Sequence, residues 1–155
     1  MITATRYAIH ALETATAERL RTAKVDDYGN EVIARAEIGP CRHCLRSSVR
    51  GERLVLVSFS PFEIRNPYKE VGPIFLHADG CERYTGADLP EAFATKPLVL
   101  RAYDYDQIIY RPEMVVDGTQ EERIVALLAD EKVAYIHARS FTSGCYLFRI
   151  DRAGE

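Results

Sequence analysis

Two short pairs of cysteine and histidine are the residues whose spacing predicts a chemistry. Cys41 and Cys44 form a Cys-x-x-Cys pair, and His77 and Cys81 form a His-x-x-x-Cys pair, with 32 residues between Cys44 and His77. Each pair supplies two ligands from one bend of the chain, and two such bends complete the tetrahedron that Zn²⁺ prefers. We therefore predict a zinc site with these four side chains as its ligands. Three thiolates in a closed site would make the metal structural.

A dithiol redox switch is the other chemistry that a Cys-x-x-Cys pair predicts. Arg42 and Arg46 would favour the thiolate forms of Cys41 and Cys44. Thioredoxin-like motifs, however, stand at the N-terminus of a helix, and residues 45–51 are too short and polar a stretch for that helix. The sequence therefore favours zinc, and a switch stays as an alternative, because oxidation of the pair would also eject a metal.

The C-terminal segment predicts a β-hairpin with strands over 133–139 and 145–150. Pairing Arg139 with Cys145 places apolar residues opposite each other on one face: Ala138 with Tyr146, Ile136 with Phe148, and Ala134 with Ile150. The other face then carries Tyr135, His137, Arg139, Cys145, Leu147 and Arg149.

This second face is the candidate site for a reaction or a ligand. His137 has the chemistry of a general acid or base, and Arg139 and Arg149 have the chemistry to clamp an anionic group. Cys145 would lie diagonally from His137, as a cysteine nucleophile beside its base would. For catalysis the residue types favour a solvated sheet face instead, whereas Tyr135, His137, Arg139 and Arg149 remain candidates for binding a ligand.

Composition limits the classes of protein. A chain of 155 residues fits one domain over 1–155, and 47% apolar with 28% charged residues is ordinary globular composition. A formal charge of −3 argues against a protein dedicated to binding nucleic acid or an anionic membrane. Early charges and the lack of a long apolar run predict no signal peptide and no membrane span. We expect a cytoplasmic protein, where thiols stay reduced.

The pattern of apolar and turn residues predicts an α+β fold, with a mostly antiparallel sheet and two short helices. Thr119 and Glu122 have the spacing of a capping box before the second helix. Pro112 places its strand at an edge or a bend, and residues 60–73 form a long connection that could cover a site. The helices are expected over 14–24 and 120–129, and the strands over 6–12, 31–38, 54–59, 74–76, 98–103, 107–116 and the two hairpin segments.

Over nearly its whole length the chain resembles the bacterial family called domain of unknown function 1203. The motifs that carry the resemblance are Pro40-Cys41-Arg42, Gly51-Glu52, Pro67-Tyr68, Gly72-Pro73-Ile74-Phe75, Val133-Ala134-Tyr135-Ile136-His137-Ala138-Arg139, Gly144-Cys145-Tyr146 and Arg149-Ile150-Asp151-Arg152. Relatives often have Asn where Ser140 stands, and some lack a cysteine at the position of Cys44. The resemblance therefore implies a common fold, but neither a reaction nor a zinc site shared by all members.

Our leading hypothesis is a small cytoplasmic α+β domain with a structural zinc site, serving as a ligand-binding or protein-binding module. A small molecule or a protein is the expected partner, with no nucleic acid and no membrane. The first alternative is a small enzyme or anionic-ligand sensor that uses His137, Arg139 and Cys145 beneath a lid formed by residues 60–73. The second is the dithiol switch at Cys41 and Cys44.

Overall fold

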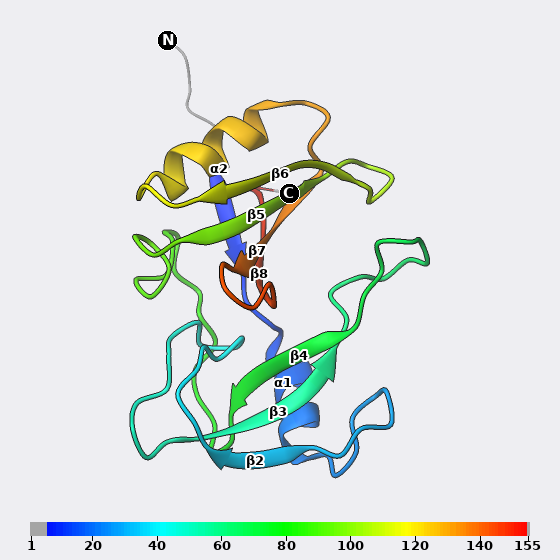
Figure 1. Cartoon of the computed structure of the whole chain (residues 1–155), viewed down its shortest axis with the longest axis vertical. Helices are drawn as coiled ribbons and strands as arrows, with labels where there is room; N and C mark the ends of the chain where they lie inside the picture. Colours follow the sequence, from blue (N-terminus) through cyan, green and yellow to red (C-terminus); the bar gives the residue numbers. More distant parts are fainter. Residues whose placement is uncertain (1–5, 155) are drawn as a thin grey trace. The chain divides into compact units, whose positions relative to one another are not determined.

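The computed structural model describes residues 6–154. They form two helices and eight strands, and the strands make one antiparallel sheet of five and one of three (Figure 1). This confirms the predicted α+β class. The chain divides into two compact units. The three-stranded unit is Ala11–Tyr84, and the five-stranded unit contains the residues up to His10 and those from Thr85 onward. A single domain over 1–155 stays a prediction.

The three-stranded unit has the strand order β2-β3-β4, with one helix beside the sheet (Figure 1). Its elements are α1 (Thr14–Thr22), β2 (Ile33–Ala36), β3 (Arg53–Phe59) and β4 (Gly72–His77). β3 is the central strand of the three, and most of its residues are apolar. Helix α1 contacts β4 and buries Ala17 and Leu20, and it ends two residues earlier than the sequence pattern indicated.

The core of this unit includes two of the predicted metal ligands. Cys41 is fully buried and Cys44 is 8% exposed, and both belong to one apolar cluster. The other buried members are Leu12, Ala17, Leu20, Val55, Val57, Ile74 and Leu76. Compact units of this size often depend on a metal or a cross-link for their stability.

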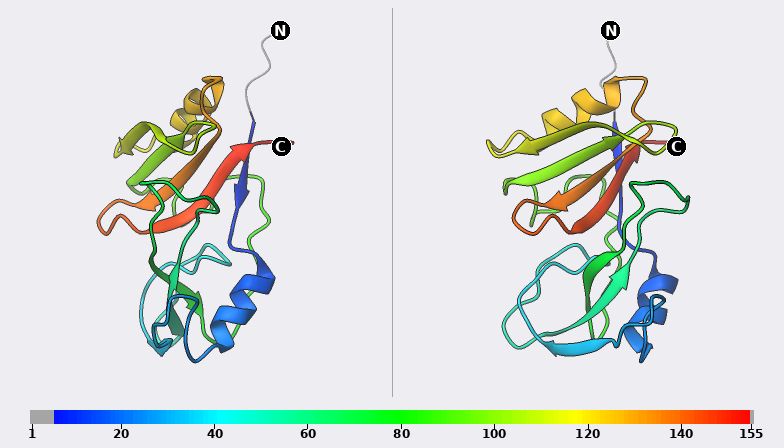
Figure 2. Two further views of the ribbon diagram at one scale, coloured as in Figure 1. Left: turned by 90° about the vertical axis from the view of Figure 1, so that its right-hand side faces the viewer. Right: turned by 45° about the vertical axis from the view of Figure 1, so that its right-hand side comes forward.

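The five-stranded unit has the strand order β1-β8-β7-β5-β6 and carries helix α2, which contacts β1, β5 and β6 (Figure 2). Its elements are β1 (Tyr7–His10), β5 (Leu98–Tyr103), β6 (Ile109–Val115), α2 (Gln120–Ala129), β7 (Tyr135–Ser140) and β8 (Tyr146–Arg152). β6, which contains Pro112, lies at an edge of the sheet as predicted.

Helix α2 has the predicted bounds and buries the apolar side chains of Ile124, Leu127 and Leu128. The predicted capping box is wrong. Thr119 is the N-cap residue, but its side chain makes no capping hydrogen bond and instead donates to the carboxylate of Asp117. The carboxylate two residues upstream competes successfully for the threonine hydroxyl, because a charged acceptor makes the stronger hydrogen bond.

The predicted register of the C-terminal hairpin is also wrong, by two residues along most of β8. Ile136 pairs with Ile150 and Ala138 pairs with Phe148, where the sequence analysis placed Phe148 opposite Ile136. Since a shift of two residues keeps side chains on the same faces, these four side chains still form one apolar face, and all four are fully buried.

A β-bulge changes the register near the turn. Between Ala138 and Arg139 the pairing shifts by one residue, so that Arg139 lies opposite Tyr146. Cys145 falls outside β8, and its carbonyl oxygen accepts the Ser140 amide at 2.9 Å. The bulge moves Tyr146 away from the apolar face on which the sequence pattern placed it.

Arg152 ties β8 to the end of α2. Its guanidinium donates to the carbonyl oxygens of Leu128 (2.7 and 3.0 Å), Val133 (2.7 Å) and Asp130 (2.9 Å). These contacts satisfy carbonyl groups at a helix C-terminus, where a cation is also favoured by the helix dipole.

We expect Arg152→Lys to lower the free energy of unfolding by about 1–2 kcal/mol, because an ammonium keeps the charge but cannot reach three carbonyl oxygens with a planar fork. Urea denaturation measures this change. Arg35→Lys is the control, because that side chain is 62% exposed and pairs with Glu37 at the surface, where little change is expected. Equal effects of the two substitutions would contradict the role of Arg152.

Candidate metal centre

Residues 39–48, which we call the cysteine turn, fold back on themselves around Cys41 and Cys44. The Leu45 amide donates to the Cys41 carbonyl at 3.0 Å, and the Cys41 amide donates to the Arg46 carbonyl at 3.1 Å. Leu45 takes a left-handed conformation with φ of 57°, and its side chain is buried. This conformation is unfavourable for a residue other than glycine, and burial of the leucine side chain offsets its cost.

The cysteine turn is held along the outer edge of β4. Cys41 forms a parallel bridge with Phe75, and the Arg42 amide donates to the Phe75 carbonyl at 3.0 Å. Two residues further along β4, the His77 amide donates to Cys41 Sγ at 3.4 Å. The strand therefore delivers His77 beside the turn, and the loop after the strand returns Cys81 to the same place.

Gly39 is required where the cysteine turn meets β4. A Cβ atom there would lie 2.8 and 2.9 Å from the Phe75 ring, so a side chain needs the ring to move. We expect Gly39→Ala to cost about 1–3 kcal/mol of stability and to weaken metal retention. Thermal unfolding checks this, with Gly72→Ala as control, since a Cβ at Gly72 meets no atom within 4 Å. A wild-type melting temperature for Gly39→Ala would contradict the assignment.

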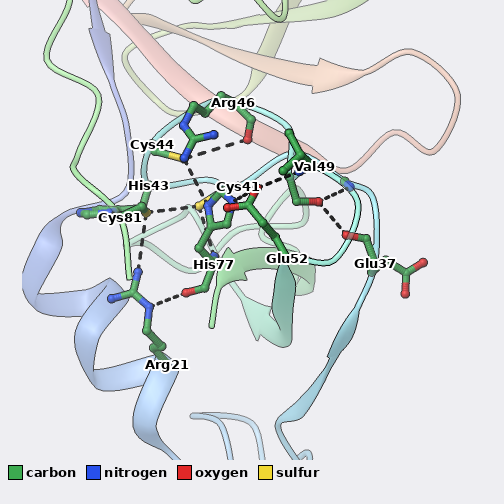
Figure 3. Close-up of polar contacts among 12 residues, drawn as sticks. Arg21, Glu37, Cys41, His43, Cys44, Arg46, Val49, Glu52, His77 and Cys81 are labelled. Atoms are coloured by element: carbon green, nitrogen blue, oxygen red, sulfur yellow. Dashed lines mark hydrogen bonds and ion pairs between the residues drawn. The ribbon is translucent and has the colours of Figure 1, made fainter. Parts of the chain in front are cut away.

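The structure brings together all four predicted ligands. One donor atom from each of Cys41, Cys44, His77 and Cys81 lies within 4.8 Å of every other (Figure 3). Cys41 Sγ is 3.8 Å from Cys81 Sγ, and Cys44 Sγ is 3.3 Å from His77 Nδ1. The first three residues are buried and Cys81 is partly exposed. The arrangement can hold one metal ion.

Glu52 orients the histidine of this group. Its Oε1 lies 3.4 Å from His77 Nε2 and accepts the Val49 amide at 2.7 Å (Figure 3). That amide, with the nearby histidine, lowers the pKa of the Glu52 carboxyl. At 3.4 Å the contact with His77 is electrostatic and longer than an ordinary hydrogen bond. It favours a proton on Nε2, which leaves the Nδ1 lone pair directed at the sulfur cluster, as in carboxylate–histidine–metal triads.

Two nitrogen donors surround Cys81. His43 Nδ1 lies 3.2 Å from Cys81 Sγ and its Nε2 lies 2.9 Å from the Thr14 hydroxyl. Arg21, on α1, donates to Cys81 Sγ at 3.8 Å and to the His77 carbonyl at 2.6 Å. Burial lowers the pKa of His43, and its ring connects the Cys81 sulfur with the Thr14 hydroxyl.

The three sulfur atoms shift one another's pKa values. The pKa of Cys41 is lowered, chiefly by hydrogen bonds with Cys44 and Cys81. The pKa values of Cys44 and Cys81 are raised, chiefly by their hydrogen bonds with Cys41. A thiolate among these side chains would attract a divalent cation to the four donor atoms.

A protein-family model describing proteins of unknown function, DUF1203, matches residues 39–152. The chain belongs to the DUF1203 family. The matched span contains all four donor residues, together with His43 and Glu52, whereas Arg21 and Thr14 precede it. No curated protein and no solved structure matches the chain. Neither helix in residues 6–154 has the length and apolar character needed to cross a membrane.

Sequence reasoning missed the residues around the four donors. His43 carried a weak signal, because it stands between the two cysteines of the DUF1203 chain's Cys-x-x-Cys pair. No sequence signal connected Glu52 with His77, since the pairing of β3 with β4 brings the two residues together. Arg21 is one of several charged residues on α1, and nothing in the spacing distinguishes it.

Much of the hairpin face of this DUF1203 protein is buried, which corrects the expectation of a solvated Arg139 on an exposed sheet, whereas the Arg149 side chain is 43% exposed. Tyr135 is 5%, His137 0% and Arg139 3% exposed. The His137 ring contacts the rings of Tyr103, Tyr135 and Tyr146, with centroids 5.0–5.1 Å apart. Burial lowers the pKa of His137 well below its usual value, and nearby arginines lower it further.

Two hairpin candidates remain: Arg149 is paired with other side chains, and Cys145 lies in the turn. The Arg149 guanidinium lies 4.1 Å from the centre of the Tyr135 ring and forms two hydrogen bonds with Asp151. Cys145 Sγ contacts the Ser143 carbonyl at 3.9 Å, within the turn. Catalytic use of His137 and Cys145 stays a prediction, as does ligand binding by this face.

Proposed function

We propose that this DUF1203 protein is a zinc-binding protein, in which Cys41, Cys44, His77 and Cys81 hold one structural Zn²⁺ ion. The distances between donor atoms carry the proposal. A tetrahedral ion with Zn–S bonds of about 2.3 Å and a Zn–N bond of about 2.0 Å needs S···S edges of about 3.8 Å and S···N edges of about 3.5 Å. The Cys41–Cys81 sulfurs are 3.8 Å apart, and Cys44 Sγ is 3.3 Å from His77 Nδ1.

The donor set supports zinc in a structural role. Thiolate and imidazole ligands in a tetrahedral arrangement suit Zn²⁺ or iron, and disfavour the hard ions Mg²⁺ and Ca²⁺. Four protein ligands leave no position for water or substrate. Three thiolates around Zn²⁺ give a net charge of −1, which the nearby guanidinium of Arg21 balances (3.8 Å from Cys81 Sγ).

Binding would join parts of the three-stranded unit that are far apart in sequence. The cysteine turn supplies two ligands, the end of β4 supplies His77, and the following loop supplies Cys81. Arg21 adds a link to α1. Because such a site does not exist in the unfolded chain, the free energy of zinc binding adds to the stability of the folded unit.

A cytoplasmic location is part of this proposal, because a reducing compartment keeps three ligand thiols free of disulfides. Within it, a small molecule or another protein remains the partner that we propose for the hairpin residues Tyr135, His137, Arg139 and Arg149. Such a partner would have to compete with Asp151 for the Arg149 guanidinium.

Metal analysis of protein purified without chelator tests the zinc site. We expect one equivalent of zinc per chain, and a marked fall in melting temperature after removal with a strong chelator under reducing conditions. Readdition of zinc should restore the melting temperature, whereas Mg²⁺ should not. Protein that carries no metal and has four freely titrating thiols would contradict the proposal. Protein that carries one equivalent of iron would show that iron, and not zinc, is the native ion.

A further inference from the structure

The four donors of the proposed zinc site differ in their access to solvent. Cys41 is fully buried and Cys44 is 8% exposed, whereas Cys81 is partly exposed. Cys81 also lies in the loop that follows β4 rather than in the hydrogen-bonded cysteine turn. A small oxidant dissolved in water therefore meets Cys81 before the other two sulfurs.

Two nitrogen groups face the sulfur of Cys81. His43 Nδ1 lies at 3.2 Å and Arg21 Nη2 at 3.8 Å. As a ligand of the proposed zinc ion Cys81 would be a thiolate, and a partly exposed thiolate is the form that oxidants attack. The same N–H groups can donate to the oxygen atom that leaves when peroxide reacts.

A second sulfur is within reach of the first. Cys41 Sγ lies 3.8 Å from Cys81 Sγ, so a bond between them needs a closure of about 1.8 Å to reach the usual S–S length of about 2.05 Å. Cys41 is thus placed as the thiolate that resolves an oxidised Cys81.

We propose that Cys81 is a peroxide-reactive ligand, and that its oxidation to a disulfide with Cys41 releases the bound zinc. The inference rests on the proposed zinc function and adds a regulatory chemistry to it. It differs from a switch at Cys41 and Cys44, which the Cys-x-x-Cys spacing alone suggests.

The reaction has two steps. The Cys81 thiolate attacks one oxygen of hydrogen peroxide, so an S–O bond forms while the O–O bond breaks, and hydroxide leaves. The Cys41 thiolate then attacks the Cys81 sulfur, so the S–S bond forms while the S–OH bond breaks, and a second hydroxide leaves. Each hydroxide takes a proton from solvent to become water. The two sulfurs lose two electrons and peroxide gains them, which leaves zinc with only two ligands.

The experiment starts from the full chain loaded with one equivalent of zinc, whose content is measured first. Excess hydrogen peroxide is added in the presence of a metallochromic zinc indicator, and disulfides are mapped by mass spectrometry without reduction. We expect release of one zinc per chain together with one Cys41–Cys81 disulfide, and recovery of binding after treatment with a dithiol. Cys145→Ser should release zinc at the wild-type rate, because Cys145 lies outside the cluster.

His43→Phe tests the surroundings of Cys81, because the ring volume is kept while the N–H donor is lost. We expect zinc release about tenfold slower at equal peroxide, the equivalent of one hydrogen bond to a charged group. An unchanged rate would remove His43 from the mechanism.

The two proposals fail in different ways. A chain that binds no zinc before oxidation contradicts the zinc function itself. Zinc that stays bound in excess peroxide overturns only the oxidative release. A disulfide between Cys41 and Cys44 overturns the assignment of Cys81 and favours the switch within the Cys-x-x-Cys pair.

Discussion

Cys44→Ser is expected to weaken zinc binding by at least about 100-fold and to lower the stability of the zinc-loaded protein by about 3 kcal/mol. The total binding free energy of a structural zinc site is about 10–16 kcal/mol, and one of four ligands accounts for a share of that size. Serine keeps the shape of the side chain but is a far weaker ligand for zinc than thiolate. Competition with a chelator of known affinity measures the first effect, and urea denaturation in excess zinc measures the second.

Two comparisons separate metal binding from packing. Cys145→Ser removes a thiol outside the cluster and should leave zinc affinity unchanged. In the presence of chelator, Cys44→Ser should lose only the packing contribution of the buried Cys44 side chain, so its difference from wild type should shrink to about 1 kcal/mol. A difference that stays as large without zinc as with it would show that Cys44 acts through the core alone.

The four donors could be predicted from sequence because ligand spacing is local. A pair of ligands two or three residues apart requires only one bend, and the chain supplies one bend at Cys41 and another after His77. The residues that surround the site were not predictable in this way. Glu52 meets His77 because β3 and β4 pair, and Arg21 meets Cys81 because α1 contacts β4. Their identity depends on tertiary contacts that no spacing encodes.

For the C-terminal hairpin, the sequence predicted the faces of the strands but not their register. Alternation of residue types predicted which side chains share a face, and Ile136, Ala138, Phe148 and Ile150 do share one. The register itself failed, because a bulge at Arg139 and a turn closed at Ser140 take up residues that an ideal ladder would pair. Alternation has a period of two, so it cannot distinguish registers that differ by two residues.

His137 is expected to make the stability of the protein depend on pH. Burial, with Arg139, Arg149 and Arg101 nearby, holds its pKa well below the usual value, and the rings of Tyr103, Tyr135 and Tyr146 pack around it. In the unfolded chain the same histidine has a pKa of about 6.5. As pH falls below that value, the unfolded chain binds a proton that the folded protein does not, so the free energy of unfolding decreases by about 1.4 kcal/mol per pH unit.

The sign follows from this difference in bound protons. Above about pH 7.5 both states hold neutral histidine, and the group makes no pH-dependent contribution. His137→Phe removes the titration while keeping an aromatic ring. The stability of wild type relative to His137→Phe should therefore fall between pH 6.5 and pH 5, by up to about 1.6 kcal/mol, measured by urea denaturation across that range. Loss of zinc at low pH affects both proteins and cancels in the comparison.

Parallel stability curves for the two proteins would contradict a lowered pKa. The outcome also bears on the predicted chemistry of the hairpin. A histidine whose pKa lies well below neutrality is mostly neutral at pH 7, so little imidazolium is present to act as a general acid, whereas the neutral ring can act as a base or as a hydrogen-bonding group. A measured dependence with the expected sign would therefore favour these two roles for His137 over acid catalysis.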